Sequence, residues 1–261
     1  MTRFACLIFT FMMMLTSAHA ASIMPDFSTV PTGWVTDRYQ PDFFGNIGEF
    51  EGRDNVLQIG ITDDGSSQNR PDGQQGTFYN THGMKYTVTG GVGSYLSADL
   101  FIDELWESSV NGHVRTDMWG VMSSETSITA YPIIGFTNYG GVGRFRAFDG
   151  DLSGGLGAWV DFNTEVSYGD WTSFKILFTG SAFDFFINDA LVYSDTTIGL
   201  TTGFSAVIMQ AYNFGDPAIQ DTIVNDYTAH WSNTQPVPEP TAFLLLSVGL
   251  LGVLGIQRRT R

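Results

Sequence analysis

The chain has 261 residues, with 12 Lys or Arg and 27 Asp or Glu, which gives a formal net charge of −15. Four of the basic residues lie in the first three and last four positions, so the segment between them carries a balance of 8 − 27 = −19. So acidic a segment repels nucleic acid and anionic lipid, and it predicts no nucleic-acid partner. The only cysteine is Cys6, which excludes disulfides, thiolate metal sites and thiol nucleophiles from everything after it.

The first twenty residues have the three parts of a secretory signal peptide. Arg3 supplies a positive charge, residues 4–15 form an apolar core, and the small residues Ala18 and Ala20 have the spacing of a signal peptidase site. We therefore predict cleavage by signal peptidase, with Ala21 as the first residue of the exported protein.

Residues 21–233 are predicted to form one all-β domain, followed by a spacer over 234–236. Thirty glycines and 21 phenylalanines favour strands joined by tight turns. Strands are expected at residues 55–62, 84–89, 95–103, 115–123, 130–138, 144–149, 158–162, 171–179, 183–188, 191–194, 204–213 and 222–231. Their spacing of about 8 to 15 residues is typical of an antiparallel two-sheet β-sandwich. A further edge strand over Asp26–Trp34 is expected to pair near the last one.

Two predicted strands show the alternation of apolar and polar residues that is expected of a half-buried strand. Leu96 to Ile102 and Phe174 to Phe178 place an apolar residue at every second position. Asn188-Asp189 separates two strand-like runs and tolerates the positive φ of a hairpin turn. This segment and the tryptophan-led strand before it resemble the concanavalin A-like and laminin-G-like jelly rolls. The resemblance implies two stacked antiparallel sheets with loops at their rims, where such domains often hold one calcium ion.

Acidic residues do not match the catalytic strand of laminarinase-like glycosidases, which share this fold. Those enzymes place three carboxylates at alternating positions of one strand, so that all three point into one cleft. Here Asp99 and Asp103 share a face, whereas Glu104 points to the other. Activity as a polysaccharide lyase of unusual type remains an alternative. The side chains that such an enzyme could use are available at His82, His113, Arg115 and Tyr139, but their spacing does not single them out as a catalytic set.

Two acidic loops are candidates for calcium, which prefers oxygen ligands in flexible loops. The first holds Asp149 and Asp151, the second holds Asp216 and Asp221, and residues 63–69 are a weaker third. Aspartate next to glycine is also an ordinary turn composition, so both interpretations stay open.

Aromatic side chains near loops are candidates for stacking on sugars, with polar partners for the hydroxyls. The chain offers Trp106, Trp119, Tyr131, Tyr139, Trp159, Tyr212 and Phe214. Most must fill the core, and the selected platforms are Trp106, Tyr139 and Tyr212. Their predicted polar partners are Asn138, Arg144 and Asn213.

The C-terminal residues form a three-part tail. The first part is a tag over 237–241, in which Pro238 and Pro240 hold Val237-Pro238-Glu239-Pro240 extended. An apolar run over 242–256 is predicted to be a hydrophobic helix, although it is shorter than the roughly 20 residues of a permanent span. The basic residues Arg258, Arg259 and Arg261 follow it and favour a cytoplasmic end. The tail resembles the PEP-CTERM sorting signal, although an ordinary C-terminal anchor is the alternative.

That resemblance implies recognition by an exosortase, an inner-membrane intermediate, and release to the surface or extracellular matrix of a Gram-negative bacterium. Together these features predict an exported, non-catalytic module that binds glycan or associates with exopolysaccharide, with calcium as a candidate cofactor. A structural or adhesion protein without a glycan ligand, and an atypical lyase or hydrolase, are the alternatives.

Overall fold

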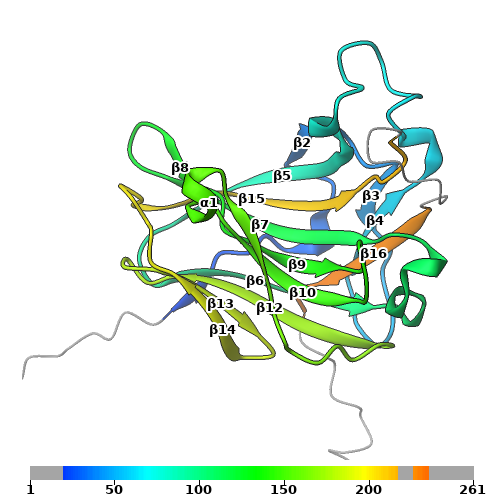
Figure 1. The fold of residues 1–261 in the computed structure, drawn as a ribbon. Coiled ribbons are helices and arrows are strands. Elements are labelled where there is room, and N and C mark those ends of the chain that lie inside the picture. Colours follow the sequence, from blue (N-terminus) through cyan, green and yellow to red (C-terminus); the bar gives the residue numbers. More distant parts are fainter. Residues whose placement is uncertain (1–19, 217–225, 235–261) are drawn as a thin grey trace, which may run out of the picture.

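The computed structural model describes residues 20–216 and 226–234, which form two β-sheets stacked face to face (Figure 1). Residues 1–19 of the predicted signal peptide, the sorting tail and Asp221 lie outside these ranges. Within them, no helix has the length and apolar character needed to cross a membrane.

The first sheet, sheet A, has eight strands. Its order is β14 (Ala190–Asp195), β13 (Phe183–Ile187), β12 (Asp170–Phe178), β6 (Ser94–Ile102), β16 (Tyr227–Ser232), β4 (Leu57–Ile61) and β3 (Phe43–Asn46), with β1 (Ala21–Ser22) beside β6. All pairings are antiparallel except that of β1 with β6.

The second sheet, sheet B, also has eight strands. Its order is β11 (Ala158–Asp161), β10 (Arg144–Asp149), β9 (Ile133–Thr137), β7 (Arg115–Ser123), β15 (Gly203–Tyr212), β5 (Thr81–Gly90) and β2 (Trp34–Arg38), with β8 (Ile128–Ala130) beside β7. All of these pairings are antiparallel.

Helical structure in the described ranges is limited to single turns in the connections. These turns are η1 (Phe27–Thr29), η2 (Asp63–Gly65), η3 (Thr77–Asn80), η4 (Glu104–Glu107), η5 (Ser109–Asn111) and α1 (Leu152–Gly155). Asp26 and Asp103 begin η1 and η4 by accepting hydrogen bonds from the amides of Ser28 and Leu105.

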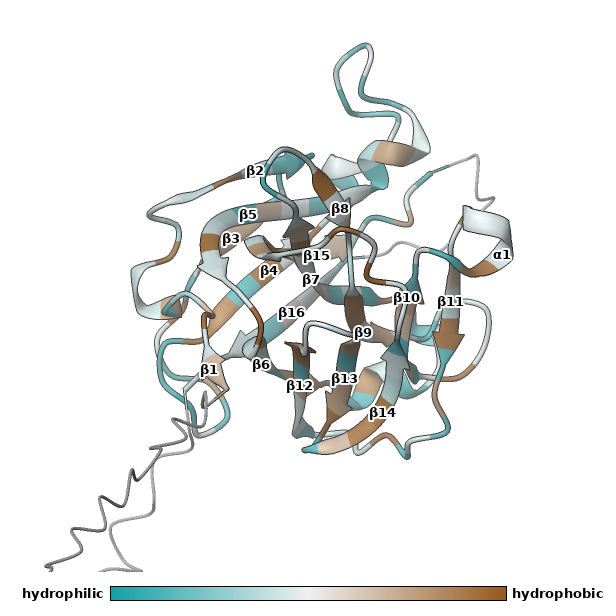
Figure 2. Cartoon of the chain, turned by 90° about the vertical axis from the view of Figure 1, so that its left-hand side faces the viewer, coloured by the Kyte–Doolittle hydropathy of each residue, from teal (hydrophilic) through white to brown (hydrophobic). Residues whose placement is uncertain are grey.

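The core between the sheets confirms the predicted alternation. Leu96, Leu100 and Ile102 of β6 are fully buried, as are Phe174 and Ile176 of β12. Hydrophobic and hydrophilic segments alternate along β12 and β13 (Figure 2). Because successive side chains of a strand point to opposite faces, one face of each strand fills the core.

The hairpin between β13 and β14 is also confirmed. Asn188 and Asp189 have φ angles of 48° and 62°, the left-handed conformation that such a turn requires. The side-chain oxygen of Asn188 accepts a hydrogen bond from the amide of Ser173, at 2.9 Å, and ties the turn to the neighbouring strand.

Two strand predictions were wrong. Asp26–Trp34 is not an edge strand beside the last strand: it contains η1, and the strand that begins at Trp34 pairs with β5 in sheet B. The strand expected over 130–138 is two strands, β8 and β9, separated by Tyr131 and Pro132. Proline has no amide hydrogen for the ladder, which explains the interruption.

Candidate functional site

The outer face of sheet B, turned away from the core, carries a second buried cluster. Trp119 and Val121 of β7 pack there against Ile133, Ala206 and Ile208, with Phe148 and Trp159 at the side. A sheet face that looked only into solvent would not bury so many apolar side chains. The outer face of sheet B is therefore recessed, and it is the candidate functional site.

A row of polar side chains, interrupted by two glycines, crosses the outer face of sheet B. Its members are directly paired neighbours on all seven strands of the sheet path, in the order Asp161, Arg146, Gly135, Asp117, Gln210, Gly83 and Asp37. At Gly135 a β-carbon would lie 2.4 Å from a carboxylate oxygen of Asp117, so the carboxylate occupies the space above a residue without a side chain. The register thus gathers polar groups on one line across the sheet.

Asp117 is at the centre of the row and is completely buried. Its Oδ2 accepts hydrogen bonds from Nε of Arg115, at 2.8 Å, and from Nε2 of Gln210. Four nearby buried atoms have no hydrogen-bond partner among the described residues: Asp117 Oδ1, Gln210 Oε1, Arg146 Nε and Trp119 Nε1. An unsatisfied buried polar group costs about 1–3 kcal/mol, so this row favours ordered water or a polar ligand beside it.

Arginines lie over aromatic rings along the same face. The guanidinium carbon of Arg146 is 3.7 Å from the ring centre of Trp159, and that of Arg115 is 4.7 Å from it. Arg38 lies 4.4 Å from the ring centre of Trp119. Burial lowers the pKa of Arg146 to about 9; the positive charges of Arg115 and Arg144 add to this effect, and Asp117 opposes it. The cations are therefore only partly compensated.

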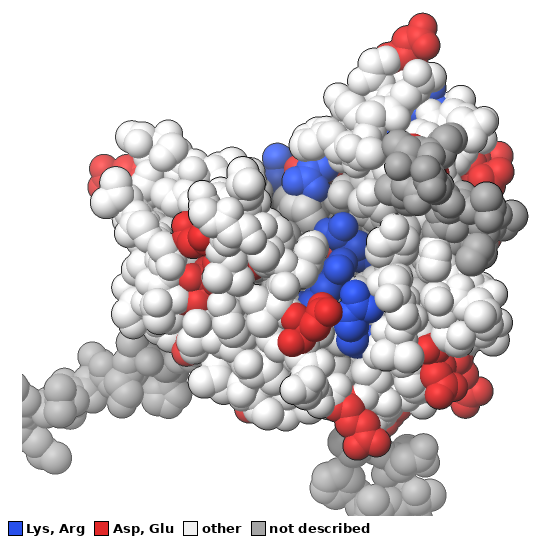
Figure 3. Space-filling model, in the orientation of Figure 1, with Lys and Arg blue, Asp and Glu red and all other residues white. Residues whose placement is uncertain are grey.

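Positive charge is concentrated on this face although the protein is acidic. Five of the eight basic residues between the terminal segments lie on it, namely Arg38, Lys85, Arg115, Arg144 and Arg146. Figure 3 shows Lys and Arg side chains gathered in a hollow of the surface, between two raised lobes. The net charge of the chain thus conceals a basic site.

Three of the predicted glycan-binding residues lie together at one end of this face. Tyr139 is 40% exposed and stacks on Phe214, with ring centres 4.9 Å apart. Tyr212 packs against the same Phe214 ring, at 4.8 Å. Arg144 donates to the carbonyl of Tyr139, at 3.1 Å, and its Nε donates to Asp161, at 2.8 Å.

The other three are structural residues rather than surface ones. Trp106 is only 5% exposed and stacks on the core residue Phe136. Asn138 is fully buried, accepts from the amide of Val114 and donates to the carbonyl of Trp106. These side chains complete the hydrogen bonding of buried loops, which residue type alone does not reveal.

Asn213 has the same kind of role. Its side chain donates to the carbonyl of Thr62, at 3.0 Å, and accepts from the amide of Gly215, at 2.8 Å. It is 1% exposed, so it positions the loop that carries Phe214.

Asp117 and Arg146, at the centre of the face, were not selected from the sequence, whereas Arg144 was selected and Arg115 and Trp119 were named only as available side chains. Their signal is a period-two pattern on two predicted strands: Arg115, Asp117 and Trp119 on one, and Arg144 and Arg146 on the other. Alternation places each set on one face of its strand. The sequence does not say that the two strands are joined through β9.

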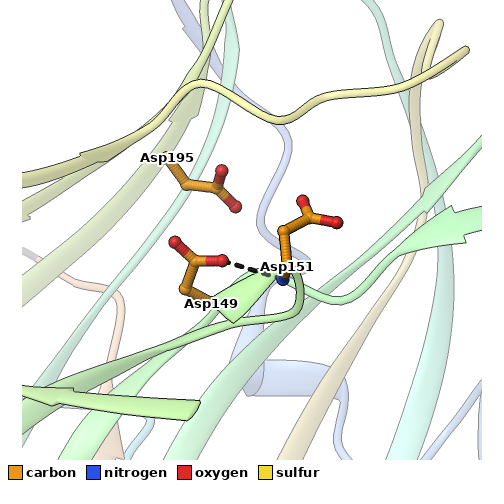
Figure 4. Close-up of side chains that lie close together, drawn as sticks. All are labelled: Asp149, Asp151 and Asp195. Atoms are coloured by element: carbon orange, nitrogen blue, oxygen red, sulfur yellow. Dashed lines mark hydrogen bonds between the residues drawn. The ribbon is translucent and has the colours of Figure 1, made fainter. Parts of the chain in front are cut away.

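A separate acidic cluster lies where the edges of the two sheets approach. Carboxylate oxygens of Asp149, Asp151 and Asp195 all lie within 4.8 Å of one another. Figure 4 shows the carboxylates of Asp149 and Asp195 turned toward each other, with Asp151 beside them. The structure thus brings together Asp149 and Asp151, as the calcium hypothesis requires, and adds Asp195.

The second predicted calcium loop is organised differently. Asp216 is buried, and its Oδ2 accepts a hydrogen bond from Nδ2 of Asn80, at 2.7 Å. Asn80 in turn accepts from Arg70, at 2.6 Å. Asp216 therefore belongs to a buried hydrogen-bond network away from the acidic cluster.

The acidic cluster fits calcium by its donor atoms. Calcium–oxygen distances of about 2.3–2.6 Å allow two ligands to lie up to about 5 Å apart, and the three carboxylates meet this limit. Burial raises the pKa of Asp195, and the charges of Asp149 and Asp151 raise it further, against a hydrogen bond from Thr197. Tyr193 donates to Asp149, at 2.6 Å. A bound cation would relieve this repulsion.

Comparison with protein families identifies a PEP-CTERM protein-sorting motif at residues 236–259. The chain therefore carries the sorting motif that its tail resembles. A comparison with curated proteins gives no match.

Several solved structures share the fold. One is a Bacteroides ovatus enzyme of glycoside hydrolase family 16 from a mixed-linkage glucan locus, 8% identical, covering 79% of this chain and 95% of that one, with a TM-score of 0.51. Others are a carbohydrate-binding module, CBM66, from Bacillus subtilis (14% identical, 82% and 96% covered, TM-score 0.41) and a second Bacteroides ovatus family 16 endo-glucanase (10%, 79% and 97%, 0.48). At 8% identity, the likeness to the first of these structures confirms the jelly-roll fold alone.

Proposed function

We propose that this protein is exported, sorted by an exosortase to the surface or extracellular matrix of a Gram-negative bacterium, and binds glycan there without cleaving it. The binding surface is the outer face of sheet B. The observation that carries the proposal is the polar row across this recessed face, with unsatisfied hydrogen-bonding atoms beside it.

Exposed aromatic rings at the edges of the face support glycan as the ligand. Phe78 is 60% exposed and lies 4.9 Å from the guanidinium of Arg38. Tyr131 is 41% exposed, packs against Trp119 and precedes β9, whereas Tyr139 follows the other end of β9. Aromatic faces stack on the apolar faces of sugar rings, while polar groups between them bond the hydroxyls.

Spacing of the carboxylates on this face supports binding without hydrolysis. Asp161, Asp117 and Asp37 are each three strands apart in the polar row. At about 4.8 Å per strand the separation is about 14 Å, whereas glycosidases hold two carboxylates about 5–9.5 Å apart. Arg115 also holds Asp117 in an ion pair.

The test is retention of polysaccharides by the exported form, purified from producing cells, with simultaneous assay for released sugar. We expect retention without release, and at least about fivefold weaker retention in Phe78→Ala and Tyr131→Ala. Phe43→Ala is the matched control, because Phe43 is 44% exposed but lies on β3 of sheet A.

Each other outcome selects an alternative. Sugar release would identify an atypical lyase or hydrolase. Folded protein that retains no polysaccharide would leave the structural or adhesion function. Chelator that abolishes retention would place the acidic cluster in the binding mechanism.

Sorting is tested separately. Replacement of Pro238, Glu239 and Pro240 by alanine is expected to keep the protein in the inner-membrane fraction, because the exosortase no longer recognises the tail. Release of this variant to the surface at the wild-type level would argue against exosortase sorting.

A further inference from the structure

We propose that the glycan bound by the outer face of sheet B is anionic, carrying carboxylate or sulfate groups that the arginines and Lys85 recognise. This inference rests on the proposed function, because it names the chemical class of the ligand for that same face.

The charge balance of the face is opposite to that of the whole protein. Its strands contribute the five cations named above and three carboxylates, Asp37, Asp117 and Asp161, a balance of 5 − 3 = +2. The segment between the terminal basic residues has a balance of 8 − 27 = −19. At physiological salt the screening length is about 8 Å, so a ligand on the face responds to the local cations more than to the distant acids.

Three of the five cations lack a close carboxylate within the described part of the chain. Lys85 and Arg146 make no ion pair there, and Arg38 approaches Asp37 only at 3.8 Å. Arg146 is 7% exposed, and no residue in 20–216 or 226–234 offers a hydrogen-bond partner to its Nε. Buried positive charge without a counterion is unfavourable, so a bound anion would stabilise this face.

Arg38 reaches the face through an unusual backbone conformation. Its φ of 61° lies in the left-handed region, at the end of β2, whose Trp34, four residues earlier, points toward the core. Strict alternation would turn Arg38 the same way, but its guanidinium lies instead over Trp119 and Phe78. A left-handed non-glycine residue costs roughly 1–2 kcal/mol. The fold thus tolerates strain that delivers a cation to the site.

The distribution of the cations fits a polymeric ligand better than a small anion. They lie on β10, β7, β5 and β2, which span five strand spacings of the sheet. At about 4.8 Å per spacing the span is about 24 Å. A polymer that carries repeated acidic groups can contact cations along this whole width, with the exposed aromatic rings stacking on its sugars.

The experiment measures affinity of the exported protein for defined polymers at low and physiological salt. Polygalacturonate and alginate supply carboxylates, dextran sulfate supplies sulfates, laminarin and dextran are neutral, and polyglutamate is an anionic polymer without sugar. We expect the acidic polysaccharides to bind at least about tenfold more tightly than the neutral ones, and more weakly as salt rises.

Two substitutions test the cations. The double variant Lys85→Gln and Arg144→Gln is expected to weaken acidic-polysaccharide binding about tenfold. Lys175→Gln is the matched control, because Lys175 lies on β12 of sheet A and, among the described residues, its ion pair is with the exposed Asp189. We expect it to change affinity less than twofold. Thermal unfolding verifies that each variant is folded.

The outcomes separate the two proposals. Equal binding of neutral and acidic polysaccharides would overturn the anionic ligand and leave glycan binding intact. Binding of no polysaccharide would overturn both. Polyglutamate bound as tightly as alginate would show non-specific polyanion binding, and a Lys175→Gln defect equal to that of the double variant would move the site off this face.

Discussion

The guanidinium of Arg146 and the indole of Trp159 are stacked, with the guanidinium carbon 3.7 Å from the ring centre. Arg146 lies on β10 opposite Asp161, and Trp159 lies on β11 opposite Phe148, so the two are diagonal neighbours across one strand pair. Such neighbours are within reach of aromatic and long side chains. The indole covers a cation whose charge is otherwise poorly compensated.

We predict that Trp159→Leu lowers the free energy of unfolding by about 2 kcal/mol, because it removes the ring over a largely buried guanidinium. Trp159→Phe keeps an aromatic face and should lose about half as much. Urea unfolding followed by circular dichroism measures both. Equal losses in the two variants would mean that the packing volume matters and the cation–aromatic contact does not.

A second prediction concerns His82, which is fully buried and has no hydrogen-bond partner for either ring nitrogen among the described residues. Burial, with a contribution from the charge of Arg70, lowers the pKa of His82 from 6.5 to about 3. The unfolded chain therefore binds a proton below pH 6.5 that the folded protein does not bind until about pH 3. Above pH 6.5 His82 is neutral in both states and does not lower the free energy of unfolding. As the pH falls from 6.5 toward about 3, protonation of the unfolded chain lowers that free energy progressively.

The expected size follows from the linkage of about 1.4 kcal/mol per pH unit. Between pH 7 and pH 5 the wild type should lose about 2 kcal/mol more than His82→Phe, which cannot take up a proton there. Urea unfolding at both pH values checks this difference. Parallel losses in the two proteins would show that His82 titrates normally.

Most of the fold could be predicted because it depends on local pattern. Alternation in Tyr95–Asp103 and the turn residues Asn188 and Asp189 are properties of a few consecutive residues, and the structure confirms them. The N-terminal segment was placed wrongly because its pairing depends on β5, which is distant in sequence. Which residues of two strands lie opposite each other depends on the whole sheet, and not on the sequence of either strand alone.

The candidate site was harder to predict for the same reason. Tyr139 and Arg144 are five residues apart and were selected together, whereas Arg38, Arg115 and Arg146 are brought onto one face only by five successive strand pairings. The overall acidity also pointed away from a basic surface. Net charge describes the average surface and does not locate the exceptions.

A third prediction concerns the acidic cluster. Asp195 has a raised pKa, through burial and then the charges of Asp149 and Asp151. A carboxyl group whose folded pKa is raised destabilises the fold once the pH exceeds that pKa. In chelator at pH 7, Asp195→Asn should therefore raise the melting temperature by about 2 °C or more, because asparagine keeps an acceptor for Thr197 without the charge.

Calcium should reverse this order. We expect added calcium to raise the melting temperature of the wild type more than that of Asp195→Asn, because the ion neutralises the three carboxylates. Asp189→Asn is a matched control on an exposed carboxylate outside the cluster. A calcium shift of equal size in all three proteins would place the ion elsewhere.

The last prediction uses the β13–β14 turn, where Asp189 has a φ of 62°. A non-glycine residue in this left-handed conformation costs about 1 kcal/mol, and Asp189→Gly removes that cost because glycine has no β-carbon. It also removes the ion pair with Lys175, but Asp189 is 88% exposed and such a pair contributes little. We expect a net gain of about 0.5 kcal/mol in the free energy of unfolding, measured by urea unfolding. The control variant Asp189→Ala loses the same ion pair but keeps a β-carbon, so it should be less stable than the wild type. Equal stability of the glycine and alanine variants would show that the backbone conformation of residue 189 does not control the stability of the turn.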